Sequence, residues 1–409
     1  MNPDTLSLRE LGRAYADAAA LPIHAEKADL WRRLNRLEAV RPLVWINEVP
    51  WHEMNVDDEL TLRCEDPLAR GVETHLRQSL YQWRHFPGDM VLDPVLYSPY
   101  VFSDTGYGYE QDIRSSGMEM GAVDFIPHIT SMADVERIST PQITPDWEAT
   151  ARNYQRLAET FDGVLPVEKR GVVHEWCAAW DNLVRWYGIQ ELYTDMTDKP
   201  DLVRESARRY MAAANARLDQ LEALGLLSAS NNNFRVGSGG LGITDQLPQP
   251  DCDPAHVRPR DQWGTATGQI FSEVSPAMHE EFCLQFERPY LERFGLSCYG
   301  CCEPLHRKVG ILRTVNNLRR ISMSPFIDLE TAAEAVGADF VFSSKPNPAY
   351  LAGEAFHPDH VRAHLGEILE RTRGCRVELI LKDVHTLRGA PQRLWEWEDI
   401  AMEMVQEYA

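Results

Sequence analysis

The chain has 409 residues, a formal net charge of −21 and 44% hydrophobic residues. This composition is typical of a globular protein and argues against long disordered regions. The negative charge would repel a phosphate backbone, so no nucleic-acid partner is expected. The sequence opens with Met1-Asn2-Pro3-Asp4, without the features of a secretory signal, and no run reaches the roughly 18 apolar residues that span a bilayer. We therefore expect a cytoplasmic protein that is not inserted in a membrane.

Apolar residues recur at helical spacing in the first forty residues, which predicts an N-terminal helical extension, residues 1–40, ahead of a single domain, residues 41–409. The short apolar run at residues 43–46 predicts the first buried strand. Residues 87–145 are rich in Pro, Gly, Tyr and Asp, and are expected to hold a strand or two within long loops. Helices are predicted on either side of that region, at residues 73–85 and 147–161.

After residue 147, predicted helices and strands alternate. The expected strands lie at residues 171–176, 226–230, 296–302, 320–325, 338–343 and 377–382, and the expected helices at residues 177–195, 199–224, 277–293, 328–337, 357–373 and 392–408. This order predicts parallel strands with crossover connections. About eight apolar strands favour an α/β fold of the (β/α)8 TIM barrel type. A doubly wound sheet is the alternative, but its Gly-rich turn after the first strand is missing.

One Gly-rich stretch, residues 237–242, lies in a long predicted loop. It has neither the Lys-Ser/Thr of a phosphate loop nor the spacing of a dinucleotide-binding turn. We expect it to form a flexible lid or a tight turn.

The strongest candidate for chemistry is the segment Ser297-Cys298-Tyr299-Gly300-Cys301-Cys302-Glu303. Side chains alternate along an extended strand, so Tyr299, Cys301 and Glu303 are predicted to share one face. A thiolate and a carboxylate on one face can both bind Zn²⁺. Cys298 is interpreted as a buried small hydrophobic residue.

The last predicted strand ends in Lys382-Asp383-Val384-His385. Because the carboxyl ends of barrel strands meet at one mouth, His385 is predicted to converge with Cys301 and Glu303 on one metal ion. Three protein ligands would leave a fourth position open for catalysis. Whether Cys302 or Asp383 replaces one of these ligands stays open.

Other polar and aromatic residues also follow predicted strands. Lys345 lies in a loop with two prolines and is expected either to bind an anionic substrate group or to be a solvated lysine. A flat or cationic substrate would suit the aromatic and imidazole side chains at the mouth. The residues expected at the mouth are Trp51, His52, His174, Trp176, Asn231 and Asn347.

In this order of motifs the chain resembles the uroporphyrinogen decarboxylase superfamily, on its branch of corrinoid-linked methyltransferases. The resemblance is best from about residue 260 to the end. It is carried there by Trp263-Gly264-Thr265-Ala266-Thr267-Gly268, the strand to Cys301, the turn Lys345-Pro346-Asn347-Pro348 and the final strand, loop and helix. Over residues 1–150 it rests on residues 44–49.

The resemblance implies a (β/α)8 barrel that holds zinc through a His-x-Cys pair after the fifth strand and a Cys after the last strand. In that family zinc lowers the pKa of an acceptor thiol, which takes a methyl group from a corrinoid on a separate protein. Cys301 matches the Cys of the pair, whereas Tyr299 stands in place of its His. His385 or Asp383 falls near the last Cys, and Glu303 is expected to make up for the lost ligand.

The leading prediction is therefore a zinc-dependent methyltransferase that acts on a small organic substrate or thiol, with the corrinoid supplied by a partner protein. Tyr299 would donate a hydrogen bond or proton. A second hypothesis is a corrinoid-independent lyase or decarboxylase that uses Lys345 as anion binder with His174 and Asp383 as acid and base. A third is a non-catalytic subunit that binds a corrinoid protein or tetrapyrrole. Whether the protein forms a homodimer is left open.

Overall fold

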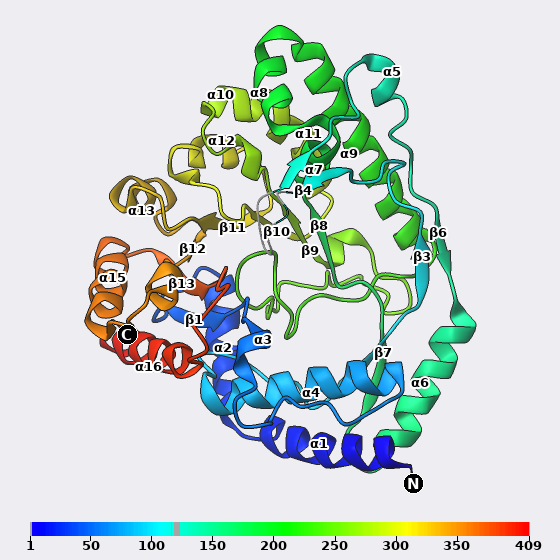
Figure 1. Ribbon diagram of the computed structural model, residues 1–409, viewed down its shortest axis with the longest axis vertical. Coiled ribbons are helices and arrows are strands. Elements are labelled where there is room, and N and C mark those ends of the chain that lie inside the picture. The colour runs from blue at the N-terminus through cyan, green and yellow to red at the C-terminus, as the bar shows by residue number, and fades with distance from the viewer. Residues whose placement is uncertain (1, 116, 118–122, 409) are drawn as a thin grey trace.

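A parallel sheet organises the chain in the computed structural model, which describes residues 2–115, 117 and 123–408 (Figure 1). Its seven strands are ordered β1-β13-β12-β11-β10-β9-β8, and every neighbouring pair is parallel. The strands are β1 (Leu43–Ile46), β8 (His174–Cys177), β9 (Trp263–Ala266), β10 (Leu296–Tyr299), β11 (Leu318–Met323), β12 (Val341–Ser344) and β13 (Arg376–Leu381). The predicted α/β fold with parallel strands is confirmed.

The remaining strands form two-stranded sheets. The parallel pair is β2 (Leu96–Pro99) with β7 (Val167–Arg170), and the antiparallel pairs are β3 (Phe102–Asp104) with β6 (Ile143–Pro145) and β4 (Ile113–Ser115) with β5 (Val123–Phe125). Only three residues separate β7 from β8, so the parallel pair lies directly beside the edge of the main sheet.

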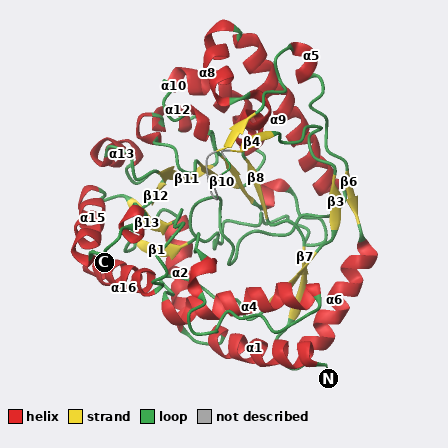
Figure 2. Ribbon diagram, viewed as in Figure 1, coloured by secondary structure: helices red, strands yellow, loops and turns green. Residues whose placement is uncertain are grey.

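Helices surround the arc of strands, as Figure 2 shows. The longer ones are α1 (Pro3–Ala19), α2 (Ile23–Asn35), α4 (Pro67–His85), α6 (Trp147–Phe161), α7 (Ala179–Tyr187), α8 (Ile189–Asp198), α9 (Pro200–Ala223), α13 (Leu329–Val336), α15 (Pro358–Arg371) and α16 (Gln392–Glu407). The short ones are α3 (Trp51–Met54), α5 (Met132–Val135), η1 (Pro259–Asp261), η2 (Gln269–Phe271), α10 (Pro276–His279), the π-helical turn η3 (Glu280–Leu284), α11 (Gln285–Leu291), η4 (Leu305–Arg307), α12 (Val309–Leu312) and α14 (Ala349–Ala352). Among the described residues no helix is long and apolar enough to cross a membrane.

Several helices begin where an aspartate can accept a hydrogen bond from the first turn. Asp66, Asp146 and Asp328 each accept one from the backbone N–H three residues on, at 3.1, 2.7 and 2.7 Å. Such an N-cap satisfies a backbone donor that the helix itself leaves free. This explains why helix 147–161 begins where the sequence predicts.

Two strand predictions are wrong. Residues 226–230 form no strand, and only a single parallel bridge joins Leu227 to Val172. Strand β9 was expected to be part of a long loop, but it pairs with both β8 and β10. Three of its four residues are small or polar, so it gives no strand signal; the pairing with neighbours on both sides stabilises it instead.

The Gly-rich stretch fills the inside of the arc and does not form a lid. Residues 236–244 are buried, and in Figure 1 the green loop before β9 lies in the middle of the strands. Ser238 Oγ donates to Gly300 O at 3.0 Å, and Gly240 N donates to Glu378 Oε1 at 3.2 Å. We call residues 236–244 the central loop. It needs glycine because strands β11 and β13 approach its backbone closely.

A buried ion pair connects the central loop to the sheet. Arg320 of β11 and Glu378 of β13 are both fully buried, with Nε and Oε1 3.2 Å apart. Arg320 Nη1 also donates to Gly240 O at 3.1 Å, and Nη2 donates to Asn35 Oδ1 at 2.8 Å. Asn35 belongs to α2, so the N-terminal helices pack against the sheet and the central loop.

A side chain at Gly240 is expected to destabilise the fold. A Cβ there would lie 2.3 Å from the indole ring of Trp31 and 2.8 Å from Glu378 Oε2. Overpacking of this kind costs about 1–3 kcal/mol, so Gly240→Ala should lower the free energy of unfolding in urea by that amount. Gly310→Ala is the control, because a Cβ at Gly310 meets nothing within 4 Å. Equal stability of the two variants would contradict the tight packing described here.

Candidate functional site

Side chains from the carboxyl ends of three strands meet at one place. Cys301 and Cys302 follow β10, Lys382 and Asp383 follow β13, and Glu48 follows β1. The carboxyl ends of parallel strands are where ligand and catalytic sites of α/β proteins form. We call these five residues the cysteine–lysine centre.

The ammonium group of Lys382 lies between the two sulfur atoms. Its Nζ is 3.0 Å from Cys301 Sγ and 3.2 Å from Cys302 Sγ, and the two sulfurs are 3.5 Å apart. Lys382 is only 3% exposed. A lysine has three N–H donors and no acceptor, so both sulfurs receive hydrogen bonds from the same positive charge.

The two thiols have opposite protonation preferences. The hydrogen bond with Cys302 and the charge of Lys382 lower the pKa of Cys301 to about 7, although burial opposes ionisation. The same contact and burial raise the pKa of Cys302. Cys302 has one S–H proton, which it can donate either to Cys301 Sγ at 3.5 Å or to Asp383 Oδ2 at 3.2 Å. Of the two, Cys301 is therefore the thiol that ionises more readily.

Charged side chains form the exposed edge of the centre. Asp383 and Glu48 each expose 41% of their side chain, and Asp383 N donates to Glu48 Oε2 at 3.2 Å. Arg235 lies 3.7 Å from Glu48 Oε1 and 5.9 Å from the ring of Trp176. Arg235 thus links the acidic edge of the centre to the ring of Trp176.

The predicted common face of Tyr299, Cys301 and Glu303 is wrong. The strand ends at Tyr299, and Gly300 then adopts a φ of +97°, which breaks the side-chain alternation. Tyr299 OH contacts His279 Nε2 at 2.7 Å and donates to Glu287 Oε2 at 2.8 Å. Its side chain therefore lies among the helices that follow β9, away from the sulfur atoms. Burial raises the pKa of Glu287 to about 8.

Glu303 is close to Cys301 through its backbone. Its Oε2 accepts a hydrogen bond from Cys301 N at 2.7 Å, and its Oε1 accepts from Thr267 Oγ1 at 2.9 Å and from Gly268 N at 3.2 Å. The carboxylate is 1% exposed. Both of its oxygens are thus used to fix the turn that carries Cys301.

The predicted zinc ligands Cys301, Glu303 and His385 are not brought together. His385 is exposed, and its loop is held elsewhere because Glu53 accepts hydrogen bonds from Thr386 Oγ1 and Leu387 N, both at 2.6 Å. Among the described residues no three His, Cys, Asp or Glu side chains form a group that could hold a metal ion. The donor set present here does not fit zinc, because the charged group between the sulfurs is the Lys382 ammonium.

Lys345 is buried and His174 is partly buried inside the arc of strands. Lys345 Nζ donates to Ser343 O at 2.9 Å and to Ser343 Oγ at 2.7 Å, and burial lowers its pKa to about 8. The alternative of a solvated lysine is therefore wrong. His174 Nε2 contacts Thr265 Oγ1 at 2.7 Å and accepts from Gly237 N at 3.2 Å. Burial and nearby arginines lower its pKa to about 3, so His174 is a neutral anchor for the central loop.

The residues predicted to contact substrate have different surroundings. His52 exposes 67% of its side chain, whereas Trp51 packs against Tyr81, with ring centres 6.1 Å apart. Asn347 Oδ1 accepts from Ala349 N at 3.0 Å and caps its own turn. Asn231 is partly buried, with its carbonyl accepting from Thr244 N at 3.1 Å. Of this group, Trp176 is linked to the cysteine–lysine centre. Its ring lies 5.9 Å from the guanidinium group of Arg235, which in turn lies 3.7 Å from Glu48 Oε1.

Lys382 is the central residue that the sequence prediction missed. It follows the apolar run 377–381 directly, the same signal that selected Asp383 and His385. Cys298 is fully buried and burial raises its pKa to about 12, which agrees with its interpretation as a small hydrophobic residue.

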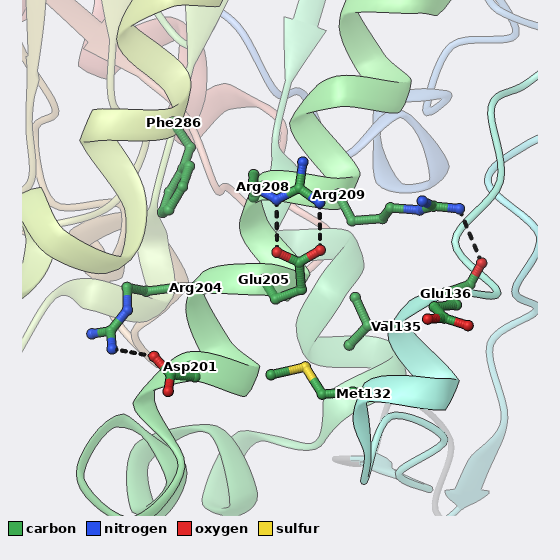
Figure 3. Close-up of a pocket in the computed structure, with 9 residues that line it drawn as sticks. All are labelled: Met132, Val135, Glu136, Asp201, Arg204, Glu205, Arg208, Arg209 and Phe286. Atoms are coloured by element: carbon green, nitrogen blue, oxygen red, sulfur yellow. Dashed lines mark hydrogen bonds and ion pairs between the residues drawn. The ribbon is translucent and has the colours of Figure 1, made fainter.

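A separate cavity of about 500 Å³ lies on the helical side of the molecule (Figure 3). Arg208 pairs with Glu205, Arg204 pairs with Asp201, and Arg209 donates to the carbonyl of Glu136. Its arginines are thus compensated within the cavity wall. The lining residues are Met132, Val135, Glu136, Asp201, Arg204, Glu205, Arg208, Arg209 and Phe286.

The fold and the centre together define a parallel α/β protein with a cysteine–lysine centre at its strand ends. No protein-family model matches the sequence, and no curated protein matches it. Among solved structures the chain is similar to a methyltransferase from Methanosarcina mazei. That similarity has a TM-score of 0.47 and 12% sequence identity, and covers 94% of this chain and 99% of the other.

Proposed function

We propose that this chain is a methyltransferase that uses the Cys301 thiolate at the mouth of a (β/α)8 barrel. The barrel would have eight strands if β7 and β8 count as one: β1, β2, β7–β8, β9, β10, β11, β12 and β13. The parallel pairing of β2 with β7 supports this closure. The sequence resemblance to corrinoid-linked methyltransferases supports the reaction class.

One observation carries the proposal: the Lys382 ammonium lies 3.0 Å from the sulfur of Cys301. A thiolate, and not a thiol, is the nucleophilic form of cysteine, and a neighbouring cation favours it. With a pKa of about 7, Cys301 is half ionised at neutral pH. A soft, negatively charged sulfur at a strand end is suited to attack a methyl carbon.

In the proposed step the Cys301 thiolate attacks the methyl carbon in line with the bond to its leaving group. The S–C bond forms as the bond between carbon and leaving group breaks, and the leaving group keeps the electron pair. The negative charge of the sulfur is consumed in this step. Lys382 then loses one of its neighbouring negative charges, while Glu48 and Asp383 remain beside it, and its ammonium group can donate a proton to the leaving group.

A second nucleophile must remove the methyl group for turnover. A corrinoid carried by a partner protein, as the resemblance implies, would supply a nucleophile or a donor of methyl groups, depending on the direction of transfer. The half-exposed Asp383 and Glu48 leave the sulfurs near the surface, which is compatible with a group presented by another protein. That the substrate is a small organic molecule, and in which direction the methyl group moves, both belong to this proposal.

The test is transfer of an isotope-labelled methyl group from methylcobalamin to the intact chain, with the acceptor residue located by peptide mass spectrometry. Cys301 should acquire the label, and Cys301→Ser should not. Cys375→Ser is the matched control, because its partly buried sulfur contacts the Ala333 carbonyl, at 3.6 Å, and lies outside the cysteine–lysine centre. A folded wild-type chain that never acquires the label at Cys301, with methylcobalamin or with methyl thioethers as donor, would refute the proposal.

The lyase hypothesis lacks comparable support. It needs Lys345, His174 and Asp383 to act on one substrate, but Lys345 donates to Ser343 and His174 to or from Thr265. Asp383 instead accepts from Cys302. Among the described residues no hydrogen bond joins the three.

A further inference from the structure

We propose that Lys382 takes the place of a metal ion in this protein, so that the Cys301 thiolate is stabilised by an ammonium group and acts without zinc. The inference rests on the proposed function and deepens it. It concerns the identity of the cation at the cysteine–lysine centre, for which the geometry of the described side chains gives three arguments.

The first argument is position. Lys382 Nζ, Cys301 Sγ and Cys302 Sγ form a triangle with sides of 3.0, 3.2 and 3.5 Å. A zinc ion bound to Cys301 at about 2.3 Å would lie no more than about 5 Å from that ammonium nitrogen. Two positive charges so close in a half-buried site repel each other, so the lysine and a divalent ion compete for the same sulfurs.

The second argument is the lack of further ligands. Zinc sites take four ligands, at least three of them from the protein in catalytic sites. Glu303 directs both oxygens to Thr267, Gly268 and the backbone of Cys301. His385 is exposed, and Glu53 holds the residues that follow it. Asp383 Oδ2 lies 3.2 Å from Cys302 Sγ, but it also lies 3.5 Å from the Lys382 ammonium, and among the described residues no three His, Cys, Asp or Glu side chains form a group that could hold a metal ion.

The third argument is that neighbouring carboxylates compensate the charge of the buried Lys382 ammonium group. It is 3% exposed, yet Glu48 Oε1 lies 3.9 Å and Asp383 Oδ2 lies 3.5 Å from its Nζ. A buried ammonium group requires such compensation. Two carboxylates and one thiolate surround it, which keeps it charged and keeps its N–H groups directed at the sulfurs.

The experiment compares the wild-type chain with Lys382→Arg, Lys382→Met and the control Lys199→Met, whose lysine is exposed and pairs only with Asp195. Metal content is measured by mass spectrometry of the purified protein, and iodoacetamide alkylation of Cys301 is followed by peptide mapping at pH 7. We expect no stoichiometric metal in the wild type. Lys382→Met should slow alkylation about fivefold and reduce the thiolate absorbance, and Lys382→Arg should restore most of both.

Stoichiometric zinc that is lost in Cys301→Ser would overturn the inference, as would unchanged alkylation in a folded Lys382→Met. If Lys382→Met does not fold, the metal content of the wild type still decides. These readouts are independent of methyl transfer. Failure to label Cys301 with methyl groups, together with zinc-free protein and lysine-dependent alkylation, would refute the proposed function alone.

Discussion

Substitution of Arg320 by methionine is expected to lower the free energy of unfolding by about 3–5 kcal/mol. The variant leaves the Glu378 carboxylate fully buried without its ion pair, and the carbonyls of the central loop lose their guanidinium donor. Since domains are typically stable by only about 5–15 kcal/mol, this loss is a large fraction of the total. Urea denaturation followed by circular dichroism measures it.

The double variant Arg320→Met, Glu378→Leu separates two causes of this loss. If the penalty comes mainly from the unpaired buried charge, removal of both charges should recover part of the stability, as it does when apolar residues replace a buried pair. A double variant as unstable as the sum of the two single variants would show that packing against Gly240 and Trp31 matters more than the charge.

Alkylation of Cys301 is expected to follow a titration with a midpoint near pH 7. The reference thiol pKa is 9.0, so at pH 7 the thiolate fraction rises from about 1% to about one half, roughly fiftyfold. The intrinsic nucleophilicity of a thiolate falls with its pKa, by about sixfold to tenfold for this shift. The net expectation is a rate about fivefold to eightfold above that of a model thiol at pH 7, falling about tenfold per pH unit below it.

The lowered pKa of Cys301 also makes the stability of the folded chain depend on pH. A thiol whose pKa is lower in the folded chain binds its proton more weakly there, so its contribution is present above the unfolded pKa and is lost as the pH falls through about 7. Because alkylation reports on the Cys301 sulfur alone, the alkylation profile is the better measurement. A midpoint at 8.5 or above in the wild type, unchanged in Cys302→Ser, would contradict the assigned thiolate.

Local sequence signals predicted the elements whose ends are set by local chemistry. The run 43–46 became β1 because apolar residues follow Pro42, and Asp146 caps the helix that begins at Trp147. The choice of Cys301 was also local, since it follows a buried strand. The alternation beyond Tyr299 could not be extrapolated, because Gly300 turns the chain with a positive φ.

The features that could not be predicted from the sequence depend on contacts between residues far apart in the chain. Lys382 meets Cys301 across 81 positions, and Gly240 meets Glu378 across 138. No periodicity distinguishes a glycine-rich surface lid from a glycine-rich interior segment. That distinction depends on how closely Arg320 and Trp31 approach, which only the assembled strands determine.

The central loop also constrains how this chain can fold. Its contacts with β11, β13 and α2 join segments far apart in sequence, and a high contact order slows folding because long chain segments must be ordered before such contacts form. The interior of the fold cannot pack until the carboxyl-terminal strands have formed around the central loop. Truncation at the far end of the chain should therefore expose the middle of the molecule to proteases and hydrogen exchange.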